Sequence, residues 1–339
     1  MSERDGRTRS FAAVAGWGDA DSTPLAGDAS GRRYLRLTRP GGGTAVLMDA
    51  EAQTQDDLRG FVRIARHLHG LGLSAPAILA EDLPARLLLL EDLGDAVFTR
   101  LSDRDPSEER RLYVAAADAL AALQGADPPL GLVRFDPPRM ASLVRIVFEW
   151  YRPALTGDTT FQGDGFVPLL EDILSDLAPD PTVLALRDCH AENLIWLPDR
   201  AGPARVGLLD FQDAVVAHPA YDLVSLLHDA RRDVAEETCA VVTRRFLDCT
   251  GHGEAAFAAT AAVVSAQRNL RILGVFARLA LRDRKPGYLR FVPRVWRLLQ
   301  RDLAHPRLAA LKARVEHDLP APDAAALARL EARCSTPAH

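Results

Sequence analysis

The apolar pattern of the chain changes near Gly94. Up to that residue, apolar positions alternate or cluster as in strands, with one amphipathic helix through Leu58 and Leu68. Beyond it, apolar residues recur mostly at helical spacing, with only brief returns to strand patterns. We therefore predict an α+β fold of two lobes, spanning residues 1–94 and 95–339, with the joint near Glu91 to Asp95. The expected strands are Pro24–Leu37, Thr44–Met48, Arg86–Leu90, Val183–Leu186, Leu194–Leu197 and Val206–Leu209, and the expected helices cover 107–124, Met140–Leu155, Phe166–Leu177 and most of the chain after Pro219.

The composition of the chain indicates its cellular compartment and the classes of partner that it can bind. The 339 residues are 48% hydrophobic and 26% charged, which suits a globular protein with a sizeable core. The amino-terminal segment lacks the apolar stretch of a signal peptide, and the four cysteines form no C-x-x-C pair, so we expect free thiols in the cytoplasm. A net charge of −5 and the lack of any 18-residue apolar run argue against nucleic-acid and membrane partners. A monomer is the working expectation.

Two polar segments follow short apolar runs and carry the candidate chemistry. The first reads L-R-D-C-H-A-E-N and holds Asp188 and Asn193, and the second reads L-L-D-F-Q-D with Asp210 at its centre. Phosphoryl transfer needs a carboxylate that orients the acceptor hydroxyl, and hard oxygen ligands that hold Mg²⁺ against nucleotide phosphates. Asp188 suits the first role, and Asn193 and Asp210 suit the second.

Either segment alone has a simpler interpretation, because Asp and Asn are common in turns and caps. The two segments occur together, in order, each behind a strand and followed by helices. That combination favours phosphoryl transfer over two unrelated turns.

The sequence resembles the aminoglycoside phosphotransferase and choline kinase group, which shares the protein-kinase-like fold. Asp188, Asn193 and Asp210 fall on its catalytic and metal positions, which implies ATP and Mg²⁺. E-D-L-G resembles the group's hinge, so the resemblance implies that the backbone around Glu91 and Leu93 holds the nucleotide base. P-A-Y-D-L resembles the following helix start, where Asp222 would brace the catalytic loop; a plain acid at a helix N-terminus is an equal alternative.

Further stretches match one branch of that group. They include G-D-A-S-G-R-R-Y-L-R, F-E-W-Y, V-G-L-L-D-F-Q-D-A and L-G-V-F-A-R-L, and they span most of the chain. The branch contains the kinases that phosphorylate the 1-hydroxyl of N-acetylmuramate and N-acetylglucosamine in cell-wall (peptidoglycan) recycling. Alternatives are a related kinase for choline, homoserine or an aminoglycoside, or an inactive nucleotide-binding module.

The chain departs from this pattern by lacking a lysine before Lys285. Kinases of this fold usually place a lysine on the third strand, where this sequence has Met48 or a neighbour. Arg32, Arg33 and Arg36 are candidate replacements, and alternation along a strand leads us to choose Arg33. Ser30, in the loop G-D-A-S-G, would cover the phosphates, although a hairpin turn explains that loop as well.

The acceptor side is suggested by a basic stretch. Ten basic residues and one acid lie between Ser265 and Arg301, which is typical of a solvated helix face or of a wall for an anionic sugar. Arginine favours bidentate contacts with carboxylates, so it would suit the lactyl group of N-acetylmuramate. Trp150 is a candidate for stacking on a sugar, although aromatic residues on such a helix are more often core. The candidate substrate contacts are His190, Gln212, Asp213, Trp150, Arg268 and Arg271.

Overall fold

The computed structural model describes residues 3–25 and 31–335. The chain forms two compact units. Unit 1 comprises Met1–Leu130 and Leu186–Ala214, and unit 2 comprises Gly131–Ala185 and Val215–His339. The segment with Asp188, Asn193 and Asp210 therefore clusters with the amino-terminal unit, although it lies far along the chain.

Unit 1 is built on a five-stranded sheet in which every neighbouring pair is antiparallel. The strand order is β1-β2-β3-β5-β4. The register sets Tyr34 opposite Met48 and Arg36 opposite Val46. The strands are β1 (Asp21–Pro24), β2 (Arg33–Thr38), β3 (Thr44–Asp49), β4 (Ile78–Asp82) and β5 (Leu87–Glu91).

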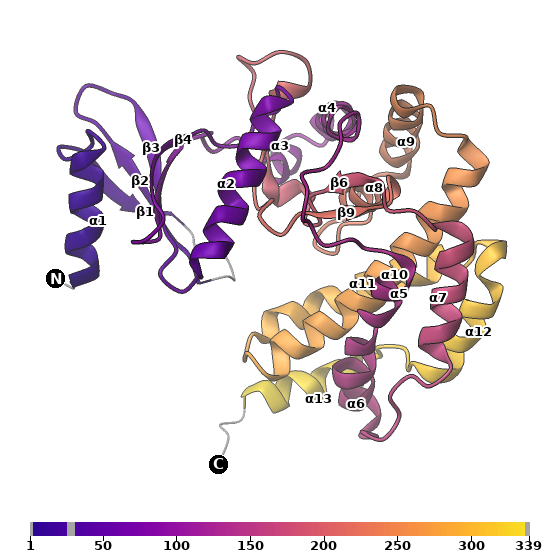
Figure 1. Ribbon diagram of the computed structural model, residues 1–339. Helices are drawn as coiled ribbons and strands as arrows, with labels where there is room; N and C mark the ends of the chain where they lie inside the picture. Colours follow the sequence, from indigo (N-terminus) through magenta and orange to yellow (C-terminus); the bar gives the residue numbers. More distant parts are fainter. Residues whose placement is uncertain (1–2, 26–30, 336–339) are drawn as a thin grey trace. The chain divides into compact units, whose positions relative to one another are not determined.

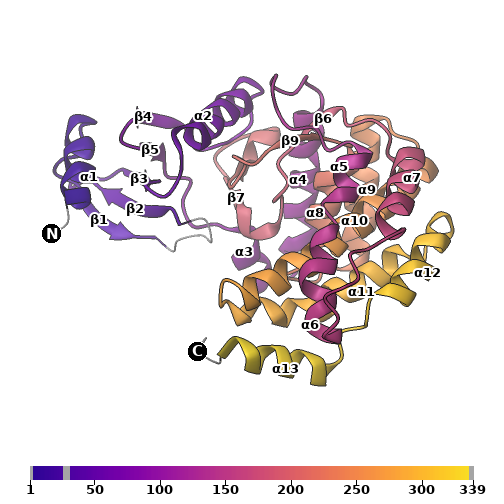
Figure 2. The same cartoon turned by 60° about the horizontal axis from the view of Figure 1, so that its bottom comes forward.

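The two faces of this sheet are covered by different helices. Helix α1 (Glu3–Val14) packs on the face that carries Leu37, Leu47 and Leu89, where Trp17 completes a small core. Helix α2 (Gln55–Gly70) begins at a capping box on Thr54. It lies on the other side of the sheet (Figures 1 and 2). The side chains of β2 and β3 therefore divide by parity between an α1 face and an α2 face.

Helix α1 is an element that the sequence analysis did not predict. Its buried residues are Arg4, Thr8 and Ala12, so it has no apolar stripe. Arg4 instead donates to the carboxylate of Asp49 at the end of β3 and to the carbonyl oxygen of Ala85. A charged pair thus docks this helix where apolar contacts are few.

The rest of unit 1 surrounds a short hairpin. Strands β7 (Leu194–Trp196) and β8 (Val206–Leu208) pair antiparallel. A Cβ on Gly207 would lie 2.9 Å from Leu93 Cδ1 and 3.2 Å from Ile195 Cβ, so the hairpin packs closely against the segment after β5 at this glycine. The remaining elements are α3 (Phe98–Arg104), α4 (Glu108–Gln124) and the 3₁₀ turns η2 (Ala191–Asn193) and η3 (Gly202–Arg205).

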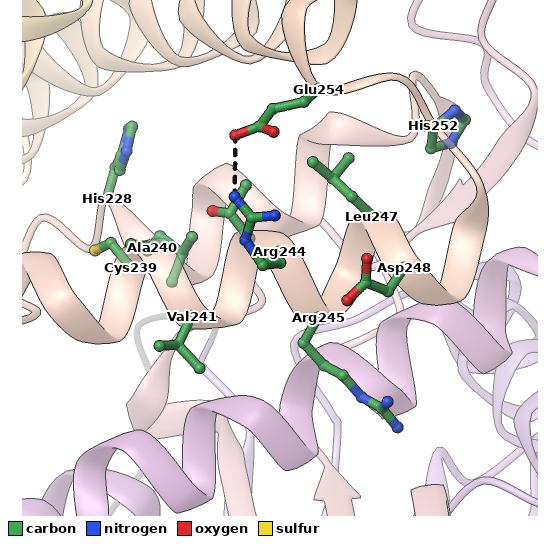
Figure 3. A pocket seen from close by; sticks show the side chains of 12 residues that line it. His228, Cys239, Ala240, Val241, Arg244, Arg245, Leu247, Asp248, His252 and Glu254 are labelled. Atoms are coloured by element: carbon green, nitrogen blue, oxygen red, sulfur yellow. Dashed lines mark ion pairs between the residues drawn. The ribbon is translucent and has the colours of Figure 1, made fainter.

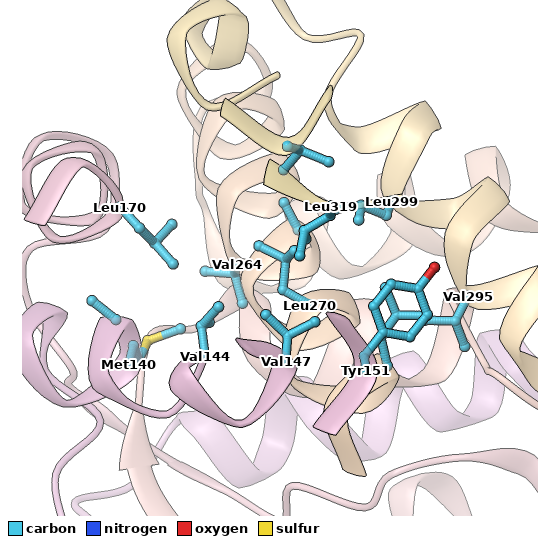
Figure 4. Close-up of a cluster of buried hydrophobic side chains, with 14 of the residues drawn as sticks. Met140, Val144, Val147, Tyr151, Leu170, Val264, Leu270, Val295, Leu299 and Leu319 are labelled. Carbon is cyan, nitrogen blue, oxygen red and sulfur yellow. The ribbon is translucent and has the colours of Figure 1, made fainter. Parts of the chain in front are cut away.

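Unit 2 is mainly helical, and its 28-residue helix α10 (Glu254–Leu281) runs through its apolar core. Figure 4 shows part of that core, where Val264 and Leu270 of α10 meet Val144, Val147 and Leu299. No described helix of the chain is long and apolar enough to cross a membrane. Two strands, β6 (Val183–Ala185) and β9 (Val215–Ala217), pair antiparallel, and the other elements are α5 (Pro137–Ser142), η1 (Val147–Tyr151), α6 (Arg152–Thr156), α7 (Phe166–Leu177), α8 (Ala220–Leu227), α9 (Glu236–Thr250), η4 (Pro286–Phe291), α11 (Val292–Asp302), η5 (Pro306–Leu308), α12 (Ala309–Asp318) and α13 (Ala324–Ser335).

The predicted single helix over Met140–Leu155 is wrong. That stretch contains α5, a π-helical turn η1 and α6. Gly274 of α10 lies so close that a Cβ there would be 2.5 Å from the carbonyl carbon of Ile146. Helix α7 has the predicted bounds, whereas the edge strand β4 was not predicted.

Candidate functional site

The polar segment after β6 turns tightly around Asn193. The side-chain amide of Asn193 donates to the carbonyl oxygen of Asp188 at 2.8 Å. The N–H of Leu209 donates to the carbonyl oxygen of Asn193 at 2.9 Å, which ties the start of β7 to the end of β8. Asp210 follows directly. The D-x-x-x-x-N spacing and the two strand ends therefore bring the three polar residues into one region of unit 1.

The carboxylates of this region are open to ligands in different degrees. Asp188 is half-buried, and no hydrogen bond or ion pair to its carboxylate is found within residues 3–25 and 31–335. Asp210 Oδ1 accepts a hydrogen bond of 2.8 Å from Gln212 Nε2. Because the Asn193 amide nitrogen already donates to Asp188, its oxygen remains as an acceptor or metal ligand.

Backbone strain accompanies two of these positions. Arg187 has φ +73° and Asp210 has φ +57°, in the left-handed region that non-glycine residues rarely adopt. Arg187 donates to the carbonyl oxygen of Asp213 at 3.1 Å. Phe211 is fully buried, and its ring centroid lies 4.8 Å from that of Phe61 on α2. These contacts hold both strained residues in place in the segments that carry Asp188 and Asp210.

A cavity of about 340 Å³ opens beside Asn193 and Asp210 within unit 1. Its walls combine apolar side chains with carboxylates, so the cavity offers both apolar contacts and charged groups to a ligand. Asp188 does not line it, but its neighbour in the turn, Asn193, does. The lining includes Tyr34, Arg36, Val46, Phe61, Leu90, Glu91, Asp92, Leu93, Asp95, Ile195, Asn193, Asp210 and Gln212.

The proposed hinge residues lie on this cavity. The N–H of Glu91 donates to the carbonyl oxygen of Ala77. One carboxylate oxygen of Glu91 accepts from the N–H of Ala77, and the other pairs with Arg200. The Glu91 side chain is therefore committed to structure, which leaves a backbone role for it. Leu93 is buried and packs against the β7–β8 hairpin at Gly207.

Arg33, the cation predicted to bind the phosphates, lies on the α1 face of the sheet. Arg33 is 57% exposed and contacts Asp5 of α1 at 3.3 Å, on the α1 face. Arg32 is only 6% exposed, and its Nη1 lies 3.8 Å from Asp210 Oδ1. Arg33 shares its face with Leu35 and Leu37, whereas Arg32 shares its face with Tyr34, so these surroundings favour Arg32 over the predicted Arg33.

Arg36 has two acidic partners at the cavity. Its Nη1 lies 2.7 Å from Asp95 Oδ2, and its Nε lies 2.7 Å from Asp92 Oδ2. Hydrogen bonds to Asp95 and Asp92 raise the pKa of Arg36. Its charge is therefore already compensated by the hinge.

The donor set fits a hard divalent cation that takes most of its ligands from elsewhere. No group of three or more His, Cys, Asp or Glu side chains able to hold a metal occurs among the described residues. Asn193 and Asp210 supply one amide oxygen and one carboxylate at the same cavity. Mg²⁺ is commonly bound through one or two protein oxygens, with phosphates and water completing its shell.

The predicted acceptor residues lie in varied surroundings. His190 is buried, with Nε2 3.4 Å from Asn193 Nδ2, whereas Asp213 is exposed. Trp150 and Arg271 of unit 2 are half-buried, and Trp150 packs against the main core.

Arg268 is buried, donates to Ser225 Oγ at 2.5 Å and lies over the Tyr221 ring. This burial argues against its predicted contact with a substrate carboxylate. Asp222 is buried in the first turn of α8, and its bracing role stays a prediction. Ser30 lies outside the described residues.

Unit 2 has a separate cavity of about 760 Å³ beside α9. Figure 3 shows Arg244 and Arg245 with Asp248 and Glu254 around it. Arg244 lies 3.6 Å from Glu254, so these charges compensate one another. None of the predicted site residues lines this cavity.

A model of the phosphotransferase enzyme family matches residues 21–258, which include the cavity, Asp188, Asn193 and Asp210. The chain belongs to this family. Relatives in the family include a protein of Caulobacter vibrioides named N-acetylmuramate/N-acetylglucosamine kinase, which is 38% identical over 94% of this chain and 98% of its own length. A Pseudomonas aeruginosa protein with the same name is 33% identical over 87% of this chain and 89% of its own.

Solved structures of related enzymes share the fold. Choline kinase LicA from Streptococcus pneumoniae gives a TM-score of 0.62 at 15% identity, covering 91% of this chain and all of that one. A choline/ethanolamine kinase family protein from Mesorhizobium loti gives 0.63 at 16% identity, covering 93% and 98%. The predicted α+β, protein-kinase-like fold is confirmed. As a family member, the chain is a phosphotransferase, for which ATP is the implied phosphoryl donor.

Proposed function

We propose that this phosphotransferase transfers the γ-phosphoryl group of ATP to the anomeric 1-hydroxyl of N-acetylmuramate or N-acetylglucosamine, in the recycling of cell-wall sugars. The relatives from Caulobacter vibrioides and Pseudomonas aeruginosa support this choice, since both are named kinases of these two sugars. The observation that carries the chemistry is the open carboxylate of Asp188 beside Asn193 and Asp210.

Each residue has a role that its surroundings support. The nucleotide base lies among Val46, Leu93 and Ile195, with the Glu91–Leu93 backbone as its polar edge. Asn193 and Asp210 would hold Mg²⁺, which would neutralise part of the charge on the phosphates when bound. Gln212 keeps the Asp210 carboxylate oriented through its 2.8 Å hydrogen bond.

Asp188 positions and deprotonates the sugar hydroxyl. The hydroxyl oxygen forms a bond to the γ-phosphorus while the bond from that phosphorus to the β–γ bridging oxygen breaks. ADP leaves with the electron pair of the broken bond. The hydroxyl proton passes to the Asp188 carboxylate. His190 and Asp213 are the proposed contacts to the sugar nearest this residue.

A comparison of acceptors tests the proposal. Purified protein with Mg²⁺ and ATP is given N-acetylmuramate, N-acetylglucosamine, choline, homoserine or an aminoglycoside, and ADP release is followed by a coupled assay. We expect turnover with one or both sugars. The 1-O-methyl glycosides are the matched controls and should give no ADP, because their anomeric oxygen is blocked.

Turnover with choline, homoserine or an aminoglycoside alone would assign the chain to another branch of its family. Thermal stabilisation by ATP and Mg²⁺ with no acceptor-dependent ADP release would indicate an inactive nucleotide-binding module. Either result contradicts the proposed sugar kinase.

A further inference from the structure

The α2 face of the sheet extends to Arg32, the residue directly before β2. Tyr34 and Arg36 both line the cavity, while Leu35 and Leu37 face the core under α1. Because side chains alternate along a strand, Arg32 belongs to the same face as Tyr34 and Arg36. Its burial and its distance of 3.8 Å from Asp210 agree with that assignment.

This position is close to the one where a lysine was expected. Met48 lies on the same face of β3 and is fully buried, opposite Tyr34 in the register. Arg32 is two residues before Tyr34, so it is the diagonal neighbour of Met48 on that face, within reach of a long side chain. An arginine on β2 can therefore reach the space that a lysine on β3 would fill.

The charges of the cavity call for such a cation. Four carboxylates line it, belonging to Glu91, Asp92, Asp95 and Asp210. Its lining cation, Arg36, is already paired with Asp92 and Asp95. Both lysines of the chain lie in unit 2. Phosphates placed beside Asp210 would meet repulsion from these carboxylates, and one Mg²⁺ would offset only part of the combined negative charge.

We infer that the guanidinium of Arg32 binds the phosphate chain of the nucleotide beside Asp210, in place of the third-strand lysine. This inference rests on the proposed function only in requiring that unit 1 binds ATP; it does not depend on the acceptor. A guanidinium presents two parallel N–H donors to phosphate oxygens and keeps its charge at every relevant pH.

Arg33 provides a matched comparison. It follows Arg32 directly and has the same side chain, but it is exposed and contacts Asp5 and Asp49 on the opposite face. Changing each arginine to methionine removes the charge and keeps most of the apolar stem. A general effect of lost positive charge would appear in both variants, whereas a direct phosphate contact would appear in one.

The test measures dissociation constants of ATP, ADP and adenosine, with Mg²⁺, for wild type, Arg32→Met, Arg32→Lys and Arg33→Met. We expect Arg32→Met to weaken ATP and ADP by about 10- to 100-fold, as for a lost hydrogen bond to a charged group, and to leave adenosine unchanged. Arg32→Lys should retain part of the affinity. Arg33→Met should resemble wild type.

Adenosine binding reports on the folded cavity without phosphates. Equal ATP-to-adenosine affinity ratios in wild type and Arg32→Met would overturn the inference, as would equal losses in Arg32→Met and Arg33→Met. If Arg32→Met does not fold, the Arg32→Lys variant provides the test. A folded Arg32→Lys protein that binds adenosine normally should still bind ATP more tightly than adenosine, because lysine keeps the positive charge. Equal affinities for ATP and adenosine in that variant would contradict the inference. Failure of wild type to bind any nucleotide would instead refute the proposed function.

Discussion

Each unit contains a cluster of polar side chains, and the two clusters differ in how many hydrogen bonds they form within the protein. In unit 1, Asp188 and Asp210 are half-buried, and the Asp188 carboxylate has no protein donor within the described ranges. In unit 2, Ser265, Asn269 and Asp302 are almost fully buried. Ser265 and Asn269 both donate to Asp302 Oδ2, at 2.6 and 2.8 Å.

The difference lies in where the hydrogen bonds go. The hydrogen bonds of the unit 2 cluster run between its own members, with His228 Nδ1 2.6 Å from Ser265 Oγ, so the cluster contributes to a specific packing of α10 and α11. The unit 1 cluster leaves oxygen atoms for a ligand. Changes in the first cluster should therefore alter chemistry, and changes in unit 2 should alter folding.

The largest expected effect is on chemistry in unit 1. Asp188→Asn keeps the shape of the side chain but removes the base that accepts the hydroxyl proton. We expect kcat to fall by at least about 10³-fold, with ATP affinity and the free energy of unfolding almost unchanged. Steady-state kinetics and urea unfolding check this. An Asp188→Asn protein with wild-type kcat would remove the proposed base.

A substitution in the core of unit 2 should lower the free energy of unfolding. A Cβ at Gly274 would lie 2.5 Å from the carbonyl carbon of Ile146 and 2.6 Å from the Val147 nitrogen. Neither atom is the end of a flexible side chain, so Gly274→Ala should destabilise the protein by about 3 kcal/mol in urea unfolding. Gly287→Ala is the control, since no atom lies within 4 Å of its Cβ position. Equal stabilities would show that η1 and α10 separate at little cost.

The buried ion pair between Arg4 and Asp49 lies in unit 1, but its charges are satisfied within the protein, as in the unit 2 cluster. Arg4→Met leaves the buried carboxylate of Asp49 with its nearest cation removed, so the free energy of unfolding should fall by about 2–3 kcal/mol. Turnover below the unfolding temperature should stay close to wild type. Arg7→Met, on the exposed side of α1, should change stability by less than about 0.5 kcal/mol. A loss of activity in folded Arg4→Met would instead indicate that this pair contributes to catalysis, as proposed for Asp188 and Asp210.

The smallest expected effect on the wild-type protein is a pH dependence in unit 2, because two titrating groups there have opposing slopes. Burial raises the pKa of Asp302 from 3.8 to about 7, so its contribution to stability is full below pH 3.8 and is lost as pH rises through 7. Burial, together with the nearby Arg301 and Arg268, lowers the pKa of His228 from 6.5 to about 3. Its contribution is present above pH 6.5 and is lost as pH falls through 3.

These two slopes oppose each other between pH 4 and pH 6.5, and each amounts to at most about 1.4 kcal/mol per pH unit. Relative to wild type, Asp302→Asn should therefore gain stability as pH rises across this window, and His228→Asn should lose it. Urea unfolding at several pH values measures both. Parallel curves for wild type and either variant would contradict the assignment.

The sequence indicates the candidate residues Asp188, Asn193 and Asp210 more clearly than the cation near them. Asp188, Asn193 and Asp210 could be proposed because oxygen ligands behind short strands suit phosphoryl transfer. The prediction of Arg33 rather than Arg32 did not use one local signal: Leu35 and Leu37 mark the core face of β2, and Arg33 shares that face.

Two other features depend on contacts distant in sequence. Helix α1 has no apolar periodicity, since it is docked by Arg4 on Asp49, 45 residues away. The π-helical turn η1 occurs where Gly274 lets two helical segments approach closely, and nothing in the residues around Phe148 indicates it. Periodicity gave α7 correctly because its apolar stripe is local to the helix.

The position of the transferred phosphoryl group tests the central claim most directly. N-acetylglucosamine labelled with ¹³C at C1 is incubated with the protein, ATP and Mg²⁺, and the product is examined by ³¹P and ¹³C NMR. The account predicts a new phosphate signal that couples to the labelled C1. A product phosphorylated at any other hydroxyl, with C1 still free to interconvert between anomers, would contradict it.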